Sequence, residues 1–326
     1  MEVVTKKKLA LISGRANEHL ASDIARCLNE QLVEPTLADF ANGEIHCRFG
    51  ESVRGTDVFI VQSHTAYGQA TINDAVMEHL IMVDAARRAS AKRITAVCPF
   101  FGYARQDRKA AGREPITAKL MANAFRVAGA NRMLSVDLHS GQIQGFFDGP
   151  WDHLTAMPVL TEYLKGVDGD LAVVSPDAGR VKVAERYSNE LGADLAIVHK
   201  RRAKDVMHSV EVTEVVGDVA GRTCVLIDDM IDTGGTIVAA ADALATRGAA
   251  NVVAATTHGV FSGPAIDRIK NSAISKVVIT NTLPLPPDKQ IDKIEVLSVA
   301  SIIADAIDAV FEDTSVSEIF GGKNLS

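Results

Sequence analysis

Short apolar runs rich in Val and Ile alternate along this chain with longer segments of helical periodicity. The apolar runs predict buried strands at residues 58–61, 94–98, 134–136, 171–174, 195–198, 225–227, 252–255 and 277–279. Helix-length segments lie between them, at residues 71–88, 116–128, 178–191 and 236–247. This alternation predicts an α/β fold, in which each central, mainly parallel sheet is flanked by helices. Ligands of such sheets bind at the carboxyl ends of the strands.

The length of 326 residues suits two domains of about 150 residues each. Weak internal similarity supports this division, because residues 52–61 resemble residues 218–227 and both segments end in an apolar strand. Residues 88–97 likewise resemble residues 247–256. Two related α/β domains would explain both similarities, although ordinary α/β sequences could produce them by chance.

The turn-forming sequence Gly149-Pro150-Trp151 marks the expected boundary between the two domains. We therefore expect an N-terminal domain at residues 1–150 and a C-terminal domain at residues 151–326. The last helical segment, residues 298–311, could pack back on the first domain.

Composition excludes several classes of protein. A net charge of −7 argues against a nucleic-acid surface. No apolar run approaches the roughly 20 residues that a membrane helix needs, and the run at residues 9–12 is too short for a signal peptide, so we expect a cytoplasmic protein. The four cysteines lack CxxC spacing and stand in or beside apolar segments, which predicts small buried side chains and no thiolate metal site.

The most informative segment, residues 224–237, runs from an apolar strand through two acids, Asp228 and Asp229, into a turn and a helix. The turn consists of Asp232, Thr233, Gly234, Gly235 and Thr236. Glycines let backbone N–H groups approach a ligand, and threonine hydroxyls and a helix N-terminus add donors for a phosphate. The acid pair would accept hydrogen bonds from two ribose hydroxyls or hold a metal ion.

A purely structural interpretation is that a threonine caps the helix and the glycines shape the turn. That interpretation does not require two adjacent acids after four apolar residues, and burying such a pair without partners costs several kcal/mol. In the first half of the chain Gln62 and Ser63 stand where the repeat places the acids, which suggests that this half lost the pocket.

With these residues the segment resembles the phosphoribosyl pyrophosphate loop of phosphoribosyltransferases and ribose-phosphate diphosphokinases. Further motifs along the chain resemble the class I diphosphokinases, also called phosphoribosyl pyrophosphate synthetases. The resemblance implies two phosphoribosyltransferase-like domains, with ATP on the first and ribose 5-phosphate on the second.

The motifs for ATP lie in the first half. No GxxxxGK[ST] loop is present. Residues 99–108 follow a predicted strand and carry Arg105 and Gln106. They resemble the family's ATP-contacting segment, although such a basic run is commonly a solvated loop.

Asn42-Gly43 predicts a hairpin at residues 37–49. This hairpin matches the family's flag region, which implies that Phe40, Asn42, Gly43 and Glu44 bind ATP.

Two motifs imply magnesium ligands. His139 follows a predicted strand in an Asp-Leu-His pattern that the family uses to bind ATP-linked Mg²⁺, although a single histidine is more often structural and Mg²⁺ prefers oxygen. Asp177 lies in a segment that resembles the family's pyrophosphate loop, and this resemblance implies that Asp177 is a second metal ligand. Arg180 departs from the family, because many members have a second glycine there.

Residues 199–210 are polar and basic and predict a mobile loop between two strands. This segment matches the family's flexible loop, which implies that Lys200 and Arg202 are catalytic and that Arg202 also contacts ribose 5-phosphate. Preorganised cations would stabilise the charge that develops on the transferred group, and loop closure would exclude water. The alternative is a solvated cluster of charges.

The resemblance implies a Mg²⁺-dependent enzyme of nucleotide biosynthesis that moves the diphosphate group of ATP onto ribose 5-phosphate and releases AMP. It also implies a homo-oligomer, a hexamer, in which a neighbour donates the hairpin. Two alternatives remain: a phosphoribosyltransferase that consumes the same diphosphate ester, and a non-catalytic homologue that regulates a true synthetase.

Overall fold

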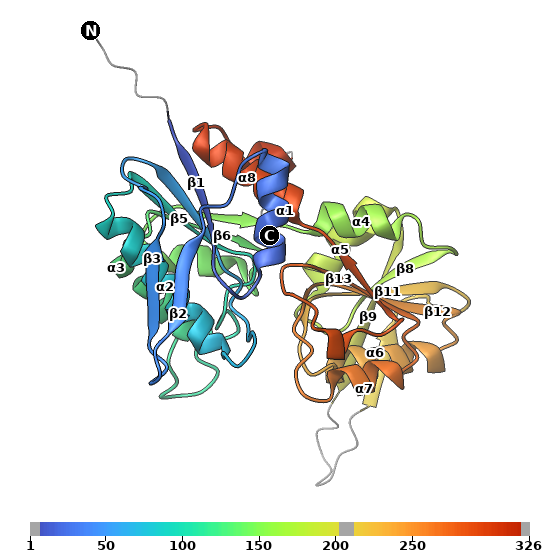
Figure 1. Ribbon diagram of the computed structural model, residues 1–326. Coiled ribbons are helices and arrows are strands. Elements are labelled where there is room, and N and C mark those ends of the chain that lie inside the picture. The colour runs from blue at the N-terminus through green and yellow to red at the C-terminus, as the bar shows by residue number, and fades with distance from the viewer. Residues whose placement is uncertain (1–6, 202–211, 321–326) are drawn as a thin grey trace. The chain divides into compact units, whose positions relative to one another are not determined.

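The computed structural model describes residues 7–201 and 212–320 (Figure 1). This part of the chain divides into two compact units. The first contains the chain up to Thr155 together with Thr282–Pro284 and the chain from Val299. The second contains Ala156–Asn281 and Leu285–Ser298.

The first unit has a five-stranded sheet in the order β1-β4-β5-β6-β7, and every pair of neighbours is parallel. Its strands are β1 (Leu9–Ser13), β4 (Asp57–Val61), β5 (Arg93–Cys98), β6 (Arg132–Val136) and β7 (Trp151–Leu154). The helices of this unit are α1 (Glu18–Leu28), α2 (Ile72–Arg88), α3 (Thr117–Ala128), η1 (Gly141–Phe146), α8 (Ala300–Phe311) and η3 (Val316–Phe320).

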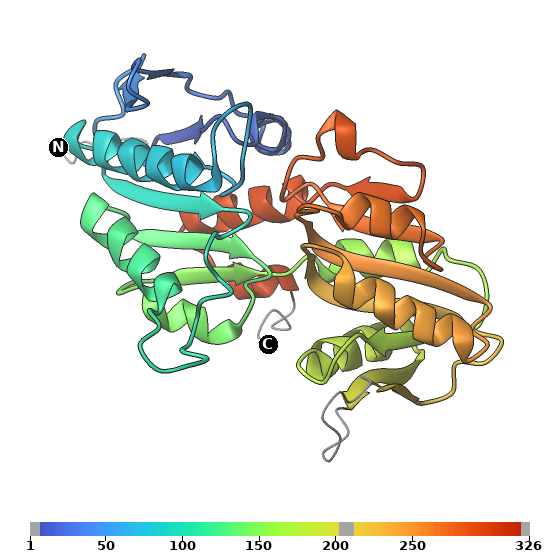
Figure 2. The same ribbon diagram turned by 90° about the horizontal axis from the view of Figure 1, so that it is seen from below.

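Helices cover both faces of this sheet, as Figure 2 shows. Alternate strand residues such as Ile12 and Ile60 form a core with Met82 of α2 and Phe125 of α3. Residues of the opposite parity, such as Leu11, are buried as well, and α1 and α8 pack against each other. The period of two along buried strands therefore accounts for two helical layers.

A separate two-stranded sheet belongs to the first unit. β2 (Pro35–Asp39) and β3 (Ile45–Phe49) pair antiparallel, with Asp39 opposite Ile45. The tip is closed by two hydrogen bonds of 2.8 Å, from Phe40 N–H to the Glu44 carbonyl and from Gly43 N–H to the Phe40 carbonyl. Gly43 has φ = 88°, a conformation that glycine adopts without strain. The hairpin that Asn42-Gly43 predicts is confirmed.

The second unit has a seven-stranded sheet in the order β10-β9-β8-β11-β12-β13-β14, parallel except for the β9–β10 pair. Its strands are β8 (Leu171–Ser175), β9 (Asp194–Arg201), β10 (Val212–Val216), β11 (Thr223–Ile231), β12 (Asn251–Gly259), β13 (Lys276–Thr280) and β14 (Ile294–Leu297). Its helices are α4 (Met157–Leu164), α5 (Val181–Leu191), α6 (Gly235–Thr246), α7 (Ala265–Lys270) and η2 (Pro287–Lys289).

The predicted fold class is confirmed, since both units have a mainly parallel sheet flanked by helices. All eight predicted strands lie within observed strands. The prediction that a loop begins at His199 is wrong for its first three residues, because β9 continues to Arg201 through pairing with β10. Residues 202–211 lie outside the described residues. Of the cysteines predicted to be buried, Cys98 and Cys224 are, whereas Cys27 is exposed.

In the described part of the chain, no helix combines the length and the hydropathy that a membrane crossing requires.

Candidate active site

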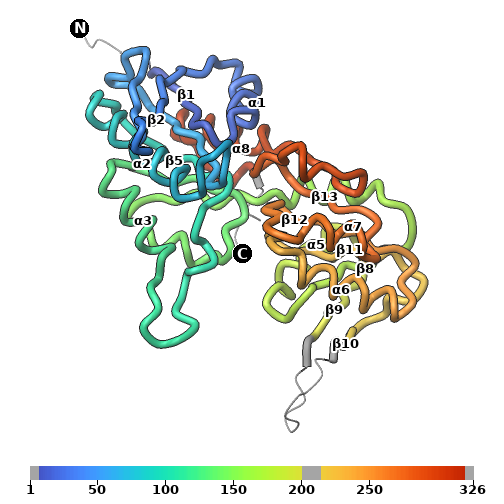
Figure 3. Tube along the Cα trace, turned by 60° about the horizontal axis from the view of Figure 1, so that its bottom comes forward, coloured from blue at the N-terminus to red at the C-terminus, as the bar shows by residue number. Residues whose placement is uncertain are grey.

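The acid pair lies inside strand β11. Asp228 is opposite Thr256 of β12, and pairing with β12 continues to Ile231. On the other side, pairing with β8 stops at Leu226. The sequence places the acids just after the strand, and this is wrong because β12 supplies partners beyond them. The acids nevertheless lie where the neighbouring strand β8 ends, and Figure 3 shows β8 and β11 side by side.

The acid pair is enclosed. The side chains of Asp228 and Asp229 are 16% and 7% exposed. Burial, followed by the charge of Asp229, raises the pKa of Asp228 to about 8, and the nearby Arg180 opposes this rise. Two carboxyl groups in so little water bind a cation, a proton or hydrogen-bond donors.

The turn after the acids leads into helix α6. Gly234 is the N-cap residue at φ = 74°, and no side chain caps the helix. The structural alternative of a threonine cap is therefore not what the turn uses. Thr233, Gly235 and Thr236 are exposed, and Arg268 Nη1 donates to the Thr233 carbonyl at 2.9 Å. The first turn of α6 thus presents backbone N–H groups and hydroxyls to a ligand, which suits a phosphate.

The loop between β8 and α5 carries Asp177 and Arg180. Asp177 is exposed, and its Oδ1 atom accepts the Gly179 N–H at 2.8 Å. Ser175 Oγ donates to the Asp177 carbonyl at 2.6 Å, which closes the turn. Arg180 precedes α5 with φ = −107°, so this position does not need glycine. An exposed carboxylate at a strand end suits Mg²⁺, which prefers oxygen ligands.

The segment at residues 99–108 leaves the carboxyl end of β5. Arg105 and Gln106 are exposed. Gln106 Oε1 accepts the Thr117 hydroxyl at 2.5 Å, at the start of α3. His139 is half-buried after β6, next to Ser140, whose hydroxyl donates to Asp107 at 2.5 Å. Arg105 and Gln106 thus lie beyond the carboxyl end of β5, and His139 lies beyond the carboxyl end of the neighbouring parallel strand β6.

At the hairpin tip, the Phe40 side chain is 56% exposed. Asn42 Oδ1 accepts the Glu44 N–H at 3.2 Å, so this asparagine shapes the turn. Arg15 anchors the hairpin, because its Nη1 and Nη2 atoms donate to the two Asp39 oxygens at 2.8 and 2.7 Å. The sequence motifs did not single out Arg15, because its partners are far away along the chain.

The backbone of Lys200 lies at the end of β9, opposite Thr213 of β10. Its side chain is outside what the structure describes, and so is the whole of Arg202. The catalytic roles of both residues stay predictions.

Gln62 and Ser63 of the first unit are fully buried and serve internal hydrogen bonds. Gln62 Oε1 accepts the Ala16 N–H at 3.1 Å, and its Nε2 donates to Glu78 at 2.8 Å. Ser63 Oγ donates to the Thr282 carbonyl at 2.7 Å. The positions that hold the acid pair in the second unit are thus structural in the first.

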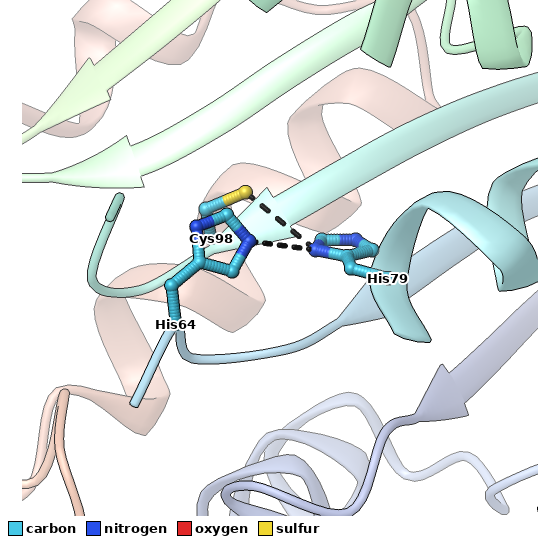
Figure 4. A group of neighbouring side chains, drawn as sticks. All are labelled: His64, His79 and Cys98. Atoms are coloured by element: carbon cyan, nitrogen blue, oxygen red, sulfur yellow. Dashed lines mark hydrogen bonds between the residues drawn. The ribbon is translucent and has the colours of Figure 1, made fainter. Parts of the chain in front are cut away.

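His64, His79 and Cys98 form the one group of three possible metal ligands among the described residues (Figure 4). The Gly102 N–H donates to His64 Nδ1 at 3.0 Å. Burial lowers the pKa of His64 to about 3, so the ring is neutral and carries its proton on Nε2, facing His79 Nδ1 at 3.2 Å. Because Nδ1 accepts the Gly102 N–H, a metal at Nε2 would leave the ring without a proton, as an imidazolate. We therefore assign this group a structural role, which is to hold the segment at residues 99–108 in place.

The fold and the site define a phosphoribosyltransferase-like protein: parallel α/β units, with an acid pair and a glycine-containing helix start at one strand end. The N-terminal domain pattern of ribose phosphate pyrophosphokinase matches residues 9–129, and the phosphoribosyl synthetase-associated domain matches residues 206–321. The chain belongs to the ribose-phosphate pyrophosphokinase family of enzymes.

Curated relatives support this assignment over the full length. The ribose-phosphate pyrophosphokinase of Streptomyces coelicolor is 59% identical over 317 residues, 97% of each chain. That of Mycobacterium tuberculosis is 51% identical over 320 residues, also 97% of each. The crystal structure of phosphoribosylpyrophosphate synthetase from Mycobacterium smegmatis has a TM-score of 0.88 and 51% identity, covering 94% of this chain and 100% of that chain. The predicted family and enzyme class are confirmed.

Proposed function

We propose that this enzyme transfers the diphosphate group of ATP to the anomeric hydroxyl of ribose 5-phosphate, giving 5-phosphoribosyl 1-diphosphate and AMP. The hydroxyl oxygen forms a bond to the β-phosphorus, and the bond from this phosphorus to the oxygen shared with the α-phosphorus breaks. AMP leaves with that oxygen, and the hydroxyl proton passes to solvent. The product would serve nucleotide biosynthesis.

One observation carries the proposal beyond family membership: the acid pair lies near the carboxyl end of the central strand β11, a few residues before the N-terminus of α6. Asp228 and Asp229 would accept the ribose hydroxyls. The residues from Asp232 to Thr236 would hold the 5-phosphate, because the first turn of α6 has no side-chain cap. Together these groups match the two ends of a ribose 5-phosphate.

The first unit would bind ATP through Arg105 and Gln106 and through the hairpin residues Phe40, Asn42, Gly43 and Glu44. Its exposed aromatic ring at Phe40 suits a purine. By resemblance to the family, the hairpin serves the site of a neighbouring subunit, so we propose a homo-oligomer, in the family manner a hexamer.

His139 would hold the Mg²⁺ that accompanies ATP, and Asp177 would hold a second Mg²⁺. Such ions would neutralise charge on the phosphates when bound. The exposed carboxylate of Asp177 fits this role. Lys200 and Arg202 would stabilise the charge that develops on the transferred group, and Arg202 would also contact ribose 5-phosphate. The described residues offer no evident general base, so positioning and charge stabilisation would supply most of the rate.

The test is to incubate the pure protein with Mg-ATP and ribose 5-phosphate and to identify the nucleotide product. We expect AMP, and only when the sugar phosphate is present. ADP would instead indicate an ordinary sugar kinase. Binding of ribose 5-phosphate without turnover would favour the phosphoribosyltransferase or the regulatory homologue. An Asp228→Asn/Asp229→Asn variant is the matched control, because it keeps the shape of the site and removes the charges.

A further inference from the structure

Arg180 lies across the acid pair. Its Nε atom is 3.2 Å from Asp228 Oδ1, and its Nη2 atom is 2.5 Å from Asp229 Oδ1. The three side chains are 14%, 16% and 7% exposed. One edge of the planar guanidinium thus bridges two carboxyl groups that are largely shielded from water, a geometry that a lysine ammonium cannot reproduce.

The fold explains why residues so distant in sequence meet. Arg180 ends the loop that follows β8, and the acids stand on β11, the neighbour of β8 in the sheet. The hydrogen bond from Gly179 N–H to Asp177 shapes this loop just before Arg180. The backbone of Arg180 is unstrained, with φ = −107° and ψ = 5°, so its side chain reaches the acids from an ordinary conformation.

The charge of the pair has to be balanced. Burial and mutual repulsion raise the pKa of Asp228, because ionising both carboxyl groups at this site costs free energy. A sugar diol donates hydrogen bonds but brings no positive charge, so the carboxylate charge that a proton on Asp228 does not neutralise needs a separate cation. A divalent metal ion would provide it and would compete for the same oxygens. The guanidinium provides it permanently, because arginine keeps its proton in proteins.

We propose that Arg180 is the resident counterion of the acid pair and keeps a divalent cation off Asp228 and Asp229, the residues to which the proposed function assigns the ribose hydroxyls. This inference rests on the proposed function and decides between the two roles that the sequence leaves open for the acids. The contacts of Arg180 use Oδ1 of both acids, and Asp228 Oδ1 also accepts the Asp229 N–H at 2.8 Å.

The first measurement counts Mn²⁺ ions bound to the protein by electron paramagnetic resonance, with the metal alone and at a pH where the acids are ionised. We expect the same number and affinity for the wild type and for Asp228→Asn/Asp229→Asn, since Arg180 already occupies the cation position. A loss of one bound ion in the double variant would overturn the proposal. This comparison requires no change at Arg180.

The second measurement uses Arg180→Gln, which keeps much of the side chain and removes the charge. We expect it to gain an additional Mn²⁺ site, or to bind an existing ion about tenfold tighter or more, because a positive charge beside that site has gone. The gain should vanish when Asp228→Asn and Asp229→Asn are added, and Arg180→Lys should not show it. A folded Arg180→Gln protein without the gain would contradict the proposal.

Calorimetry with ribose 5-phosphate in the absence of metal separates this inference from the function it rests on. We expect binding to the wild type and at least about tenfold weaker binding to Arg180→Gln, since the bared acids then lack their counterion. If the wild type releases AMP but needs Mn²⁺ at the acid pair to bind the sugar phosphate, the function stands and the counterion role falls. If neither AMP release nor sugar phosphate binding occurs, the proposed function itself has failed.

Discussion

Arg15 and Asp39 join the body of the first unit to its hairpin through two parallel hydrogen bonds of 2.8 and 2.7 Å. The same guanidinium donates through Nε to Glu78 at 2.5 Å, and the Glu78 carboxylate is fully buried. Glu78 also accepts from the Tyr67 hydroxyl at 2.9 Å and from Gln62 at 2.8 Å. A hairpin whose tip would contact ATP is thus fixed by a buried carboxylate on α2.

Replacing Arg15 by Leu leaves the buried Glu78 without its cation, and we expect the free energy of unfolding to fall by about 3–5 kcal/mol. Asp39→Asn should change stability little, because Asp39 is half exposed. It should instead raise the KM for ATP, since the hairpin loses its fixed position. Urea denaturation and steady-state kinetics test both statements. Equal destabilisation by the two variants would contradict this division of roles.

Gly234 and Gly235 make a matched pair at the start of α6. Gly234 has φ = 74°, so an alanine there would be strained by about 1–2 kcal/mol. Gly235 has no positive φ, and an added Cβ would come within 3.4 Å only of the flexible end of Arg268. We expect Gly234→Ala to weaken ribose 5-phosphate binding strongly and Gly235→Ala to weaken it less. Calorimetry decides, and a reversed order would argue against the turn geometry as the phosphate determinant.

Much of this architecture was predictable from the sequence, because buried parallel strands have a strong apolar signal. Strands β7, β10 and β14 were missed; all three lie at sheet edges, and β14 is only partly buried along its length. The hairpin turn was predictable because Asn42-Gly43 encodes its own geometry. Motifs at or just after predicted strands also drew attention to the acids, the 99–108 segment and Asp177, whose functional roles stay predictions.

Pairings between distant segments were not predictable. Arg180 stood out in sequence only as a departure from a glycine, and nothing local showed that its side chain reaches the acids on β11. The bond from Gly102 N–H to His64 similarly depends on the packing of two loops. Such contacts follow from strand order, which a single sequence does not specify.

The titration of Asp228 gives a pH dependence with a definite sign. Its pKa is raised from 3.8 to about 8 in the folded protein, so between these values the folded state binds more protons than the unfolded state. The stability contributed by the protonated group is fully present below the unfolded pKa and is lost as the pH rises through about 8. We expect the Tm of the wild type, relative to Asp228→Asn, to decrease across this window. A constant difference in Tm would show that Arg180 keeps Asp228 ionised throughout.

The predicted roles of Lys200 and Arg202 can be separated from simple binding. If these cations act on charge that develops during transfer, Lys200→Ala and Arg202→Ala should reduce kcat by orders of magnitude and alter substrate affinity little. Lys182, which lies in α5, serves as a matched control, and Lys182→Ala should keep kcat. A loss of ATP affinity, measured by calorimetry, that matches the loss of kcat/KM would make the two residues ground-state anchors.

His64 tests how the segment at residues 99–108 is held in place. Its Nδ1 atom accepts the buried Gly102 N–H, and its backbone N–H donates to the Phe100 carbonyl at 3.1 Å. His64→Leu removes only the first contact and leaves a buried donor unsatisfied, so we expect a loss of about 1–3 kcal/mol in stability. We also expect a higher KM for ATP, because Arg105 and Gln106 follow Gly102 in the same segment. Cys98→Ala, in the same cluster, should leave that KM unchanged, because the Cys98 thiol pairs with His79 and the hydrogen bond from Gly102 to His64 is kept. Zinc should not raise the Tm of the wild type or of Cys98→Ala, since the proton on His64 Nε2 occupies the position that a metal would need. A zinc-dependent rise in the Tm of the wild type would overturn the tautomer assignment.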